Sequence, residues 1–158
     1  MVHYSVTQTP FFNVTLLAEG EYLTGLRFGD QYTDLSRFEE EQSSVLDEAK
    51  SQINEFFSGD RRNFDLPIKP DGTEFQKKAW NILQKIPFGS KISYEEQAIQ
   101  IGGKQYSRAV GGANGKNPIP LIIPCHRVVA KSGKLGGFSS GLCIKRLLLD
   151  FETARLMK

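Results

Sequence analysis

In the first 30 residues, apolar side chains concentrate in three β-rich stretches that polar turn residues separate. The stretches are Tyr4–Thr9, Phe12–Ala18 and Tyr22–Phe28, and a Glu-Gly-Glu turn at 19–21 joins the last two. Short runs rich in β-branched and aromatic residues, bounded by turn residues, are typical of strands that follow one another along the chain. The pattern therefore predicts an antiparallel β-meander.

The pattern then changes to the spacing of a helix. Apolar residues recur at intervals of three and four, and Gly59 follows as a stop signal. The apolar positions are Val45, Leu46, Ala49, Ile53, Phe56 and Phe57. We expect one helix that covers the sheet, and this half contains no catalytic cluster. The segment LPIKPDG at 66–72 indicates a linker, which predicts a scaffold domain at 1–68 and a second domain at 73–158.

Beyond the linker the pattern is helical. Thr73 caps a predicted amphipathic helix that ends near Ile86, before a Pro-Phe-Gly sequence at 87–89. Ser93 caps a second predicted helix to about Gln100, and a third runs from Lys104 to about 115 after a Gly-Gly turn. The predicted class is α+β, with a mostly helical C-terminal domain that resembles a winged helix and contains a helix-turn-helix. Such helix pairs occur more often in proteins that never touch DNA, so this signal alone is weak.

The third of these predicted helices is unusually rich in glycine. Gly111, Gly112 and Gly115 each weaken a helix by about 1 kcal/mol relative to alanine. Small side chains allow close approach, either to a neighbouring helix or to the wall of a DNA minor groove. Arg108 stands near the start of this surface, where a long cation could enter a duplex.

Composition narrows the class of protein. The 158 residues suit one domain or two small ones, and no apolar run approaches the roughly 20 residues that a bilayer requires. The N-terminus lacks the features of a secretory signal, so we expect a cytoplasmic protein with reduced cysteines.

Charge divides the chain more sharply than its net value of +2 suggests. Residues 1–72 hold 6 Lys and Arg against 13 Asp and Glu, whereas residues 73–158 hold 14 against 5. The halves therefore carry −7 and +9. A basic half favours a nucleic-acid partner, although a merely dipolar protein fits the charge equally well.

One segment, NPIPLIIPCHRVV at 117–129, carries the candidate chemistry. Prolines stiffen the approach to Cys125, and the Leu-Ile-Ile run at 121–123 should be buried. His126 and Arg127 follow the cysteine directly, and nearby positive charge favours the nucleophilic thiolate. Taken alone, a cytosolic cysteine is more often a small buried hydrophobe, and a neighbouring histidine is often a core residue. Two cysteines and two histidines make a poor zinc set, so no metal is predicted.

At this point several spaced motifs resemble one family, the O6-alkylguanine-DNA alkyltransferases. The resemblance extends from about Thr73 to Glu152. Several spaced motifs that follow one another in the same order are far more specific than any single motif. It comprises Phe75-Gln76, Trp80, Ile86-Pro87, Gly89, Ser93-Tyr94, Ser107 to Ala113, Asn117-Pro118, Pro124 to Val128, Gly136, Ser139, Lys145 and Glu152. The N-terminal half matches only as a domain of sheet plus helix.

The resemblance implies roles for individual residues. Cys125 would be the nucleophile, His126 would withdraw its proton through a water, and Glu152 would orient His126. Tyr94 would hydrogen-bond guanine N3, and Asn117 would tie the helix-turn-helix to the reactive segment. The Ser139 backbone N–H would face O6, and the carbonyls of Cys125 and Val128 would read the exocyclic amine. Transfer of the alkyl group would consume the cysteine, so each molecule would react once.

The resemblance also implies double-stranded DNA as partner, bound through the minor groove. The damaged nucleotide would flip into the pocket, and Arg108 would fill its place in the stack. The residues expected to contact DNA or the base are Ser107, Arg108, Ala109, Gly111, Gly112, Ala113, Val128, Phe138 and Ser139. No cofactor is expected, and a monomer is the default.

Two departures from the family leave the size of the accepted alkyl group open, with methyl the expected one. Phe138 stands where members often have tyrosine, and Ser140 where many have glycine. Thymine O4 lesions are a second candidate substrate.

Three alternative functions remain: an alkyltransferase-like binding protein, a helix-turn-helix regulator and a cysteine hydrolase. Alkyltransferase-like proteins bind alkylguanine but lack the reactive cysteine, so Cys125 argues against the first. The segment SRAVGGANGK offers a regulator few side chains for base edges, and no oxyanion hole for a hydrolase can be placed.

Overall fold

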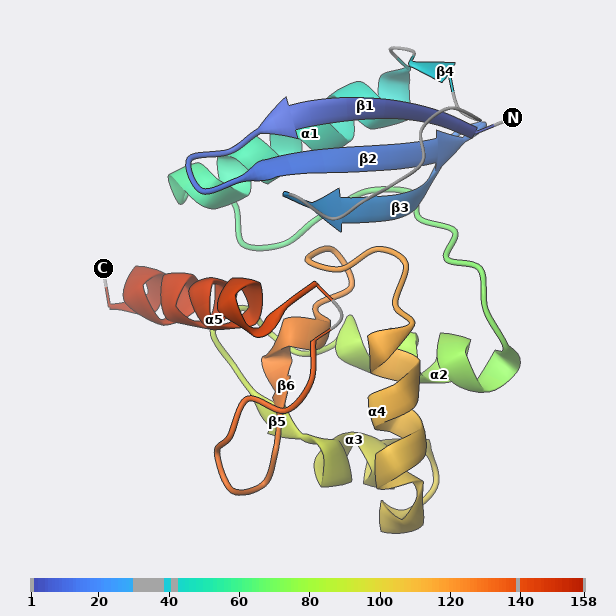
Figure 1. The fold of residues 1–158 in the computed structure, drawn as a ribbon, viewed down its shortest axis with the longest axis vertical. Coiled ribbons are helices and arrows are strands. Elements are labelled where there is room, and N and C mark those ends of the chain that lie inside the picture. The colour runs from blue at the N-terminus through green and yellow to red at the C-terminus, as the bar shows by residue number, and fades with distance from the viewer. Residues whose placement is uncertain (1, 30–38, 41–42, 139, 158) are drawn as a thin grey trace. The chain divides into compact units, whose positions relative to one another are not determined.

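The computed structural model describes residues 2–29, 39–40, 43–138 and 140–157. The chain forms two compact units, Met1–Asp71 and Gly72–Lys158. Figure 1 shows strands and one long helix in the first unit and mainly helices in the second. The α+β class is therefore confirmed.

The first unit contains the expected meander. Strands β1 (Val2–Gln8), β2 (Asn13–Glu19) and β3 (Tyr22–Phe28) pair antiparallel in sequence order. A two-residue strand, β4 (Glu39–Glu40), adds to the free edge of β1 in parallel and was not predicted, because two residues carry no periodic signal.

Helix α1 (Ser44–Ser58) lies across the sheet, as expected (Figure 1). The Ser43 hydroxyl caps its start by accepting the Leu46 N–H at 3.3 Å. Gly59 ends it in the left-handed conformation, with φ of 90°, which glycine adopts without a Cβ clash. The apolar face of the helix is buried, and Phe57 packs edge-on against Phe12 from the start of β2.

The second unit contains the predicted helix-turn-helix. Helices α2 (Glu74–Leu83) and α3 (Tyr94–Ile101) both begin with a capping box, from Thr73 and Ser93 respectively, as the sequence predicts. Helix α4 (Ser107–Gly115) packs against both of them. The Trp80 indole N–H of α2 donates to a carbonyl of α4 over 2.8 Å, which fixes these two helices together.

Two predicted helix bounds differ from the structure. The first helix stops at Leu83, and residues 84–86 continue as tight turns with bonds such as Ile86 N–H to the Leu83 carbonyl at 3.1 Å. The third begins as a 3₁₀ turn, η2 (Lys104–Tyr106), before α4 starts. Both differences are tightened terminal turns, where short-range hydrogen bonds replace the helical ones.

The remaining elements carry the reactive segment and the C-terminus. Strand β5 (Ile92–Ser93) pairs in parallel with β6 (Val128–Val129), which directly follows the 3₁₀ turn η3 (Cys125–Arg127). Helix α5 (Leu142–Leu156) was not predicted as an element. Its first cap is Gly141, which has no side chain to signal a start, and its apolar residues are spread around the helix rather than along one face.

Candidate alkyl-acceptor site

The segment before Cys125 is held by one asparagine. The Asn117 side chain donates to the Ile123 carbonyl at 2.8 Å and accepts the Ile119 N–H at 3.0 Å, so it closes the loop from both ends. Leu121 at the tip has a φ of 77°, a left-handed conformation that a branched residue adopts only where its surroundings impose it. The apolar run at 121–123 is buried, as predicted. The cysteine is therefore presented on a rigid loop.

Cys125 borders a pocket and is itself almost completely buried, with 4% of its surface exposed. Burial raises the pKa of its thiol to about 11, although a hydrogen bond from Asn117 and the charge of Lys145 act in the opposite direction. We expected the adjacent His126 and Arg127 to favour the thiolate. In the structure burial outweighs any such effect and keeps the pKa of the thiol above its usual range, while both side chains bind Glu152.

The carboxylate of Glu152, on α5, gathers hydrogen-bond partners from two distant parts of the chain, η3 and the turn at Gly89. His126 Nε2 lies 2.5 Å from Oε2, Arg127 Nε donates to Oε1 at 2.9 Å, and the Gly89 backbone N–H donates to Oε1 at 2.8 Å. Burial alone would raise the pKa of Glu152, but the hydrogen bonds and charges of His126 and Arg127 outweigh it and hold the pKa at about 2. Glu152 is therefore ionised at neutral pH.

His126 is fully buried. It follows Cys125 directly in the chain, and its Nε2 lies against the Glu152 carboxylate. Burial lowers the pKa of its imidazole, and the Glu152 carboxylate acts in the opposite direction. Its Nδ1 forms no hydrogen bond with another group of the described residues. A buried imidazole with one nitrogen held by a carboxylate and the other unused has the arrangement of a general base.

The pocket beside Cys125 has a volume of about 600 Å³. Helix α4, the start of α3 and the loop before α5 supply its walls, and the lining residues are Tyr94, Ser107, Arg108, Gly111, Asn114, Gly115, Cys125, Gly137 and Phe138. The structure thus brings six of the predicted site residues to one cavity: Tyr94, Ser107, Arg108, Gly111, Cys125 and Phe138. Ser139, predicted to face the base, lies outside the described residues.

Tyr94 stands at the start of α3 and reaches the loop on the far side of the pocket. Burial raises the pKa of its hydroxyl, while a hydrogen bond with the Gly137 backbone acts to lower it. A Cβ at Gly136 would collide with the Tyr94 hydroxyl, so glycine is required where this ring packs against the loop. A phenol that remains protonated at neutral pH can donate a hydrogen bond to a base in the pocket.

Lys145 is a site residue to which sequence reasoning assigned no role, although it belonged to the family resemblance. Its side chain is fully buried, Nζ donates to the Gly137 carbonyl at 3.1 Å, and it lies 5.8 Å from the centre of the Tyr94 ring. Burial lowers the pKa of Lys145 to about 8, against the opposite influence of Cys125. No local pattern signals this position, because the lysine reaches Gly137 and Tyr94 only once α5 is packed.

The residues of α4 divide between the surface and the core. Arg108, Ala109 and Gly112 are exposed, and Ser107 and Gly111 are partly so. Ala113 is only 4% exposed, and its carbonyl accepts the Trp80 bond, so its predicted place on a DNA-facing surface is corrected to the core. Its small side chain serves helix packing.

Val128 also lies in the core. Its side chain is fully buried, and the residue pairs with Ile92 across β5 and β6. Only its backbone could contact a base, which is the contact that the resemblance implies.

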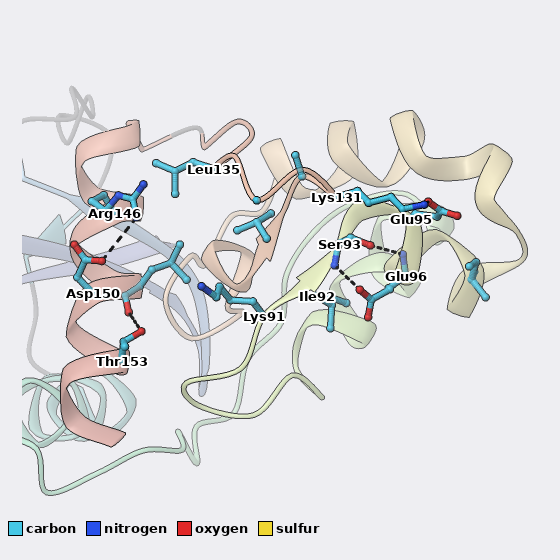
Figure 2. Close-up of a pocket in the computed structure, with 15 residues that line it drawn as sticks. Lys91, Ile92, Ser93, Glu95, Glu96, Lys131, Leu135, Arg146, Asp150 and Thr153 are labelled. Carbon is cyan, nitrogen blue, oxygen red and sulfur yellow. Dashed lines mark hydrogen bonds and ion pairs between the residues drawn. The ribbon is translucent and has the colours of Figure 1, made fainter. Parts of the chain in front are cut away.

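A second hollow in this unit, of about 510 Å³, lies between β5, β6, α3 and α5 (Figure 2). Four of its charged side chains form two ion pairs: Lys131 lies 3.3 Å from Glu95, and Arg146 lies 3.9 Å from Asp150. No cysteine or histidine is among the described residues that line it. Without a cysteine to accept an alkyl group, this hollow is not the candidate alkyl-acceptor site.

The described residues contain no group of three or more His, Cys, Asp or Glu side chains arranged to hold a metal ion. Within the same residues, no helix is both long and apolar enough to cross a membrane. Cys125 and Cys143 are both free thiols, and Cys143 is exposed on α5.

Two family models match the chain in consecutive parts. The model described as 6-O-methylguanine DNA methyltransferase, ribonuclease-like domain, matches residues 2–70, and the one described as 6-O-methylguanine DNA methyltransferase, DNA binding domain, matches residues 74–154. Together they cover both structural units.

Individual relatives match over nearly their full length. A methylated-DNA–protein-cysteine methyltransferase of Methanosarcina acetivorans is 40% identical over 96% of this chain and 98% of its own. The crystal structure of Mycobacterium tuberculosis O6-methylguanine methyltransferase superposes with a TM-score of 0.89 at 42% identity, covering 98% of this chain and 94% of that one. A crystal structure of the M. tuberculosis protein in complex with DNA has the same TM-score at 40% identity, over 97% and 94%.

Proposed function

Since this chain belongs to the O6-methylguanine DNA methyltransferase family and repairs O6-methylguanine by transfer to a protein cysteine, we propose that Cys125 is the acceptor. The observation that carries the proposal is the position of Cys125. It alone among the two cysteines lines a pocket large enough for a purine, directly before the buried His126–Glu152 pair. Each molecule therefore reacts once.

The reaction is a displacement at the alkyl carbon. His126 takes the thiol proton through a bridging water at Nδ1, and Glu152 stabilises the imidazolium that forms. The sulfur forms the new bond to carbon, and the bond from carbon to O6 breaks with its electron pair on the guanine. Tyr94 donates a proton to N3 of the departing base and regains one from His126 through solvent. The thiol proton thus ends on guanine, and the cysteine ends as a thioether.

A raised thiol pKa makes the general base necessary. With a pKa of about 11, the buried Cys125 is a thiol at neutral pH, so its proton must leave during the reaction. Asn117 positions the segment, the carbonyls of Cys125 and Val128 accept from the exocyclic amine, and the Ser139 backbone N–H donates to O6. Phe138, which lines the pocket from the loop before α5, covers the base.

Double-stranded DNA binds through α4 in its minor groove. Arg108 is exposed and lines the pocket mouth, so it can occupy the space that a flipped nucleotide leaves. Ser107, Ala109, Gly111 and Gly112 form the small-residue surface that approaches the duplex. The protein acts as a cytoplasmic monomer without metal or cofactor, and thymine O4 lesions are a second substrate.

Mass spectrometry of the protein tests the acceptor. After incubation with duplex DNA containing O6-methylguanine, the Cys125 peptide should gain the mass of one methylene, and the time course should stop at one methyl per chain. Cys125→Ser should show no transfer, whereas Cys143→Ser, the matched control, should react like the wild type. Methyl on another residue, or turnover beyond one equivalent, would overturn the proposal. An alkyltransferase-like binding protein would hold the DNA and gain no mass.

A further inference from the structure

Two buried side-chain amides join α3 to α4 next to the pocket. Gln97 Nε2 donates to Asn114 Oδ1 at 2.9 Å, and Asn114 Nδ2 donates back to Gln97 Oε1 at 2.8 Å. Gln97 is fully buried, and its second N–H is directed to the Ala79 carbonyl at 3.3 Å. The reciprocal pair fixes the Asn114 amide in one orientation.

Asn114 belongs to the pocket as well as to this pair. It lines the same cavity as Cys125, and it shares one face of α4 with Gly111, three residues before it. Gly115 also lines the cavity. The two glycines present no side chain. Asn114 is therefore the polar side chain that this part of the helix offers to the cavity, and 7% of its surface stays accessible.

The pair leaves part of the Asn114 amide unused. A side-chain amide has two N–H donors and two acceptor lone pairs, and Gln97 takes one of each. One donor and one acceptor remain for water or for a group that enters the cavity. An apolar group would remove that water without replacing its hydrogen bonds, which is costly, whereas a hydroxyl would replace them.

We propose that Asn114 is a specificity-determining residue, which makes the pocket favour alkyl groups that carry a polar atom over apolar groups of the same length. The proposal rests on the proposed transfer to Cys125. It predicts that hydroxyethyl adducts of guanine O6 are repaired faster than propyl adducts, because only the former can satisfy the amide. Gln97 does not line the cavity and acts only by holding the Asn114 amide, so it is a positioning residue.

The test compares two duplexes that differ only in the O6 substituent, hydroxyethyl or propyl. Single-turnover rate constants for the wild type should favour hydroxyethyl by about fivefold or more, the effect of one unreplaced hydrogen bond. In Gln97→Leu/Asn114→Leu, where both polar partners become apolar, the ratio should fall towards one. Removing both partners together leaves no buried amide unsatisfied, so the double variant should fold.

Gln97→Leu alone is the matched control, because it loses the pair but keeps the amide in the pocket. Because the amide stays in the pocket but is no longer held by Gln97, this variant should keep a reduced preference for hydroxyethyl, and the difference between the two variants isolates Asn114. An unchanged ratio in the double variant, or no preference in the wild type, would overturn the inference. The wild-type ratio decides alone if a variant does not fold. Failure of methyl transfer to Cys125 would instead overturn the proposed function, so the two failures are distinguishable.

Discussion

At the scale of single residues, the chemistry depends on the hydrogen bonds that the two carboxylate oxygens of Glu152 accept. Arg127 donates to both oxygens, while His126 lies against Oε2 and the Gly89 N–H donates to Oε1, so the group links the base to a cation and to a distant loop. A carboxylate with this many donors serves two purposes: it stabilises the fold and it supports the imidazolium formed during transfer.

Glu152→Gln should therefore slow alkyl transfer and weaken the fold, while DNA affinity stays nearly unchanged. Removing one partner of a buried ionic cluster costs about 3–5 kcal/mol of unfolding free energy. The folded pKa of Glu152, about 2, lies below its ordinary 4.5. Its stabilisation is thus present above pH 4.5 and is lost as pH falls towards 2.

Urea unfolding of the wild type and Glu152→Gln at several pH values tests this prediction. The gap between the two proteins should be full at pH 7 and should narrow in acid below about pH 4.5. A gap independent of pH would show that the ionised carboxylate is not its source. Loss of DNA binding in a folded variant would place Glu152 in the DNA interface instead.

Lys145 should influence transfer through its charge. Its positive charge lowers the pKa of the Cys125 thiol, and burial places the lysine's own pKa at about 8. Lys145→Met should therefore react more slowly than the wild type at pH 7. Because the lysine is charged only below its pKa, this disadvantage should shrink as pH rises through 8.

Rate constants between pH 6.5 and 9.5, measured on a small O6-alkylguanine base, give the readout. Lys134→Met is the matched control, since Lys134 is exposed on the loop before the pocket. It should leave both the rate and its pH profile unchanged. A rate ratio for Lys145→Met that is constant over this range would assign the lysine a packing role only.

At the scale of elements, α4 carries glycine where the protein interior does not require it. A Cβ at Gly112 would meet no heavy atom within 4 Å, and at Gly111 the nearest is the Tyr94 ring at 3.8 Å. Packing within the unit therefore does not account for Gly112. The proposed approach of α4 to a duplex would account for it, because each side chain on this face would separate the helix from the groove.

Gly112→Ala should consequently stabilise the protein by about 0.5–1 kcal/mol, through better helix propensity, yet weaken its binding to DNA. Thermal unfolding and fluorescence anisotropy with a duplex measure the two effects. Gly112→Leu should weaken DNA binding further because its side chain is longer. Unchanged DNA affinity in both variants would show that Gly112 does not lie in the DNA interface.

At the scale of the whole molecule, charge separates the two parts of the chain. Residues 73–158 carry +9 and residues 1–72 carry −7, so the basic charge belongs to the part that matches the DNA-binding family model. Binding of a basic surface to DNA releases counterions from the phosphates, and its strength falls as salt is added.

Affinity for an undamaged duplex should accordingly fall by about tenfold or more between 50 and 200 mM salt, since several phosphates are neutralised. Anisotropy titrations measure this slope. The rate of reaction with a free O6-alkylguanine base is the control and should stay nearly constant, because no phosphate takes part. Equal salt dependence of the two measurements would point to an effect of salt on the protein itself.

The sequence by itself determined the elements that have a strong local signal. The meander and α1 follow from apolar spacing and the stop signal Gly59, and the capped starts of α2 and α3 follow from Thr73 and Ser93. Cys125 was also identifiable, because its neighbours in the chain form one contiguous motif. Helix α5 was not, since Gly141 offers no cap and its apolar residues do not form one stripe.

Only the tertiary structure decided which partners those residues meet. The family resemblance implied the contact of Glu152 with His126, 26 residues away, but no pattern indicated its bonds with Arg127 and with Gly89, 63 residues away. Packing also decided that Ala113 lies in the core and that the buried Lys145 donates to the Gly137 carbonyl. Local patterns encode the period and ends of an element, whereas the pKa of a group depends on burial and on charges that packing brings near.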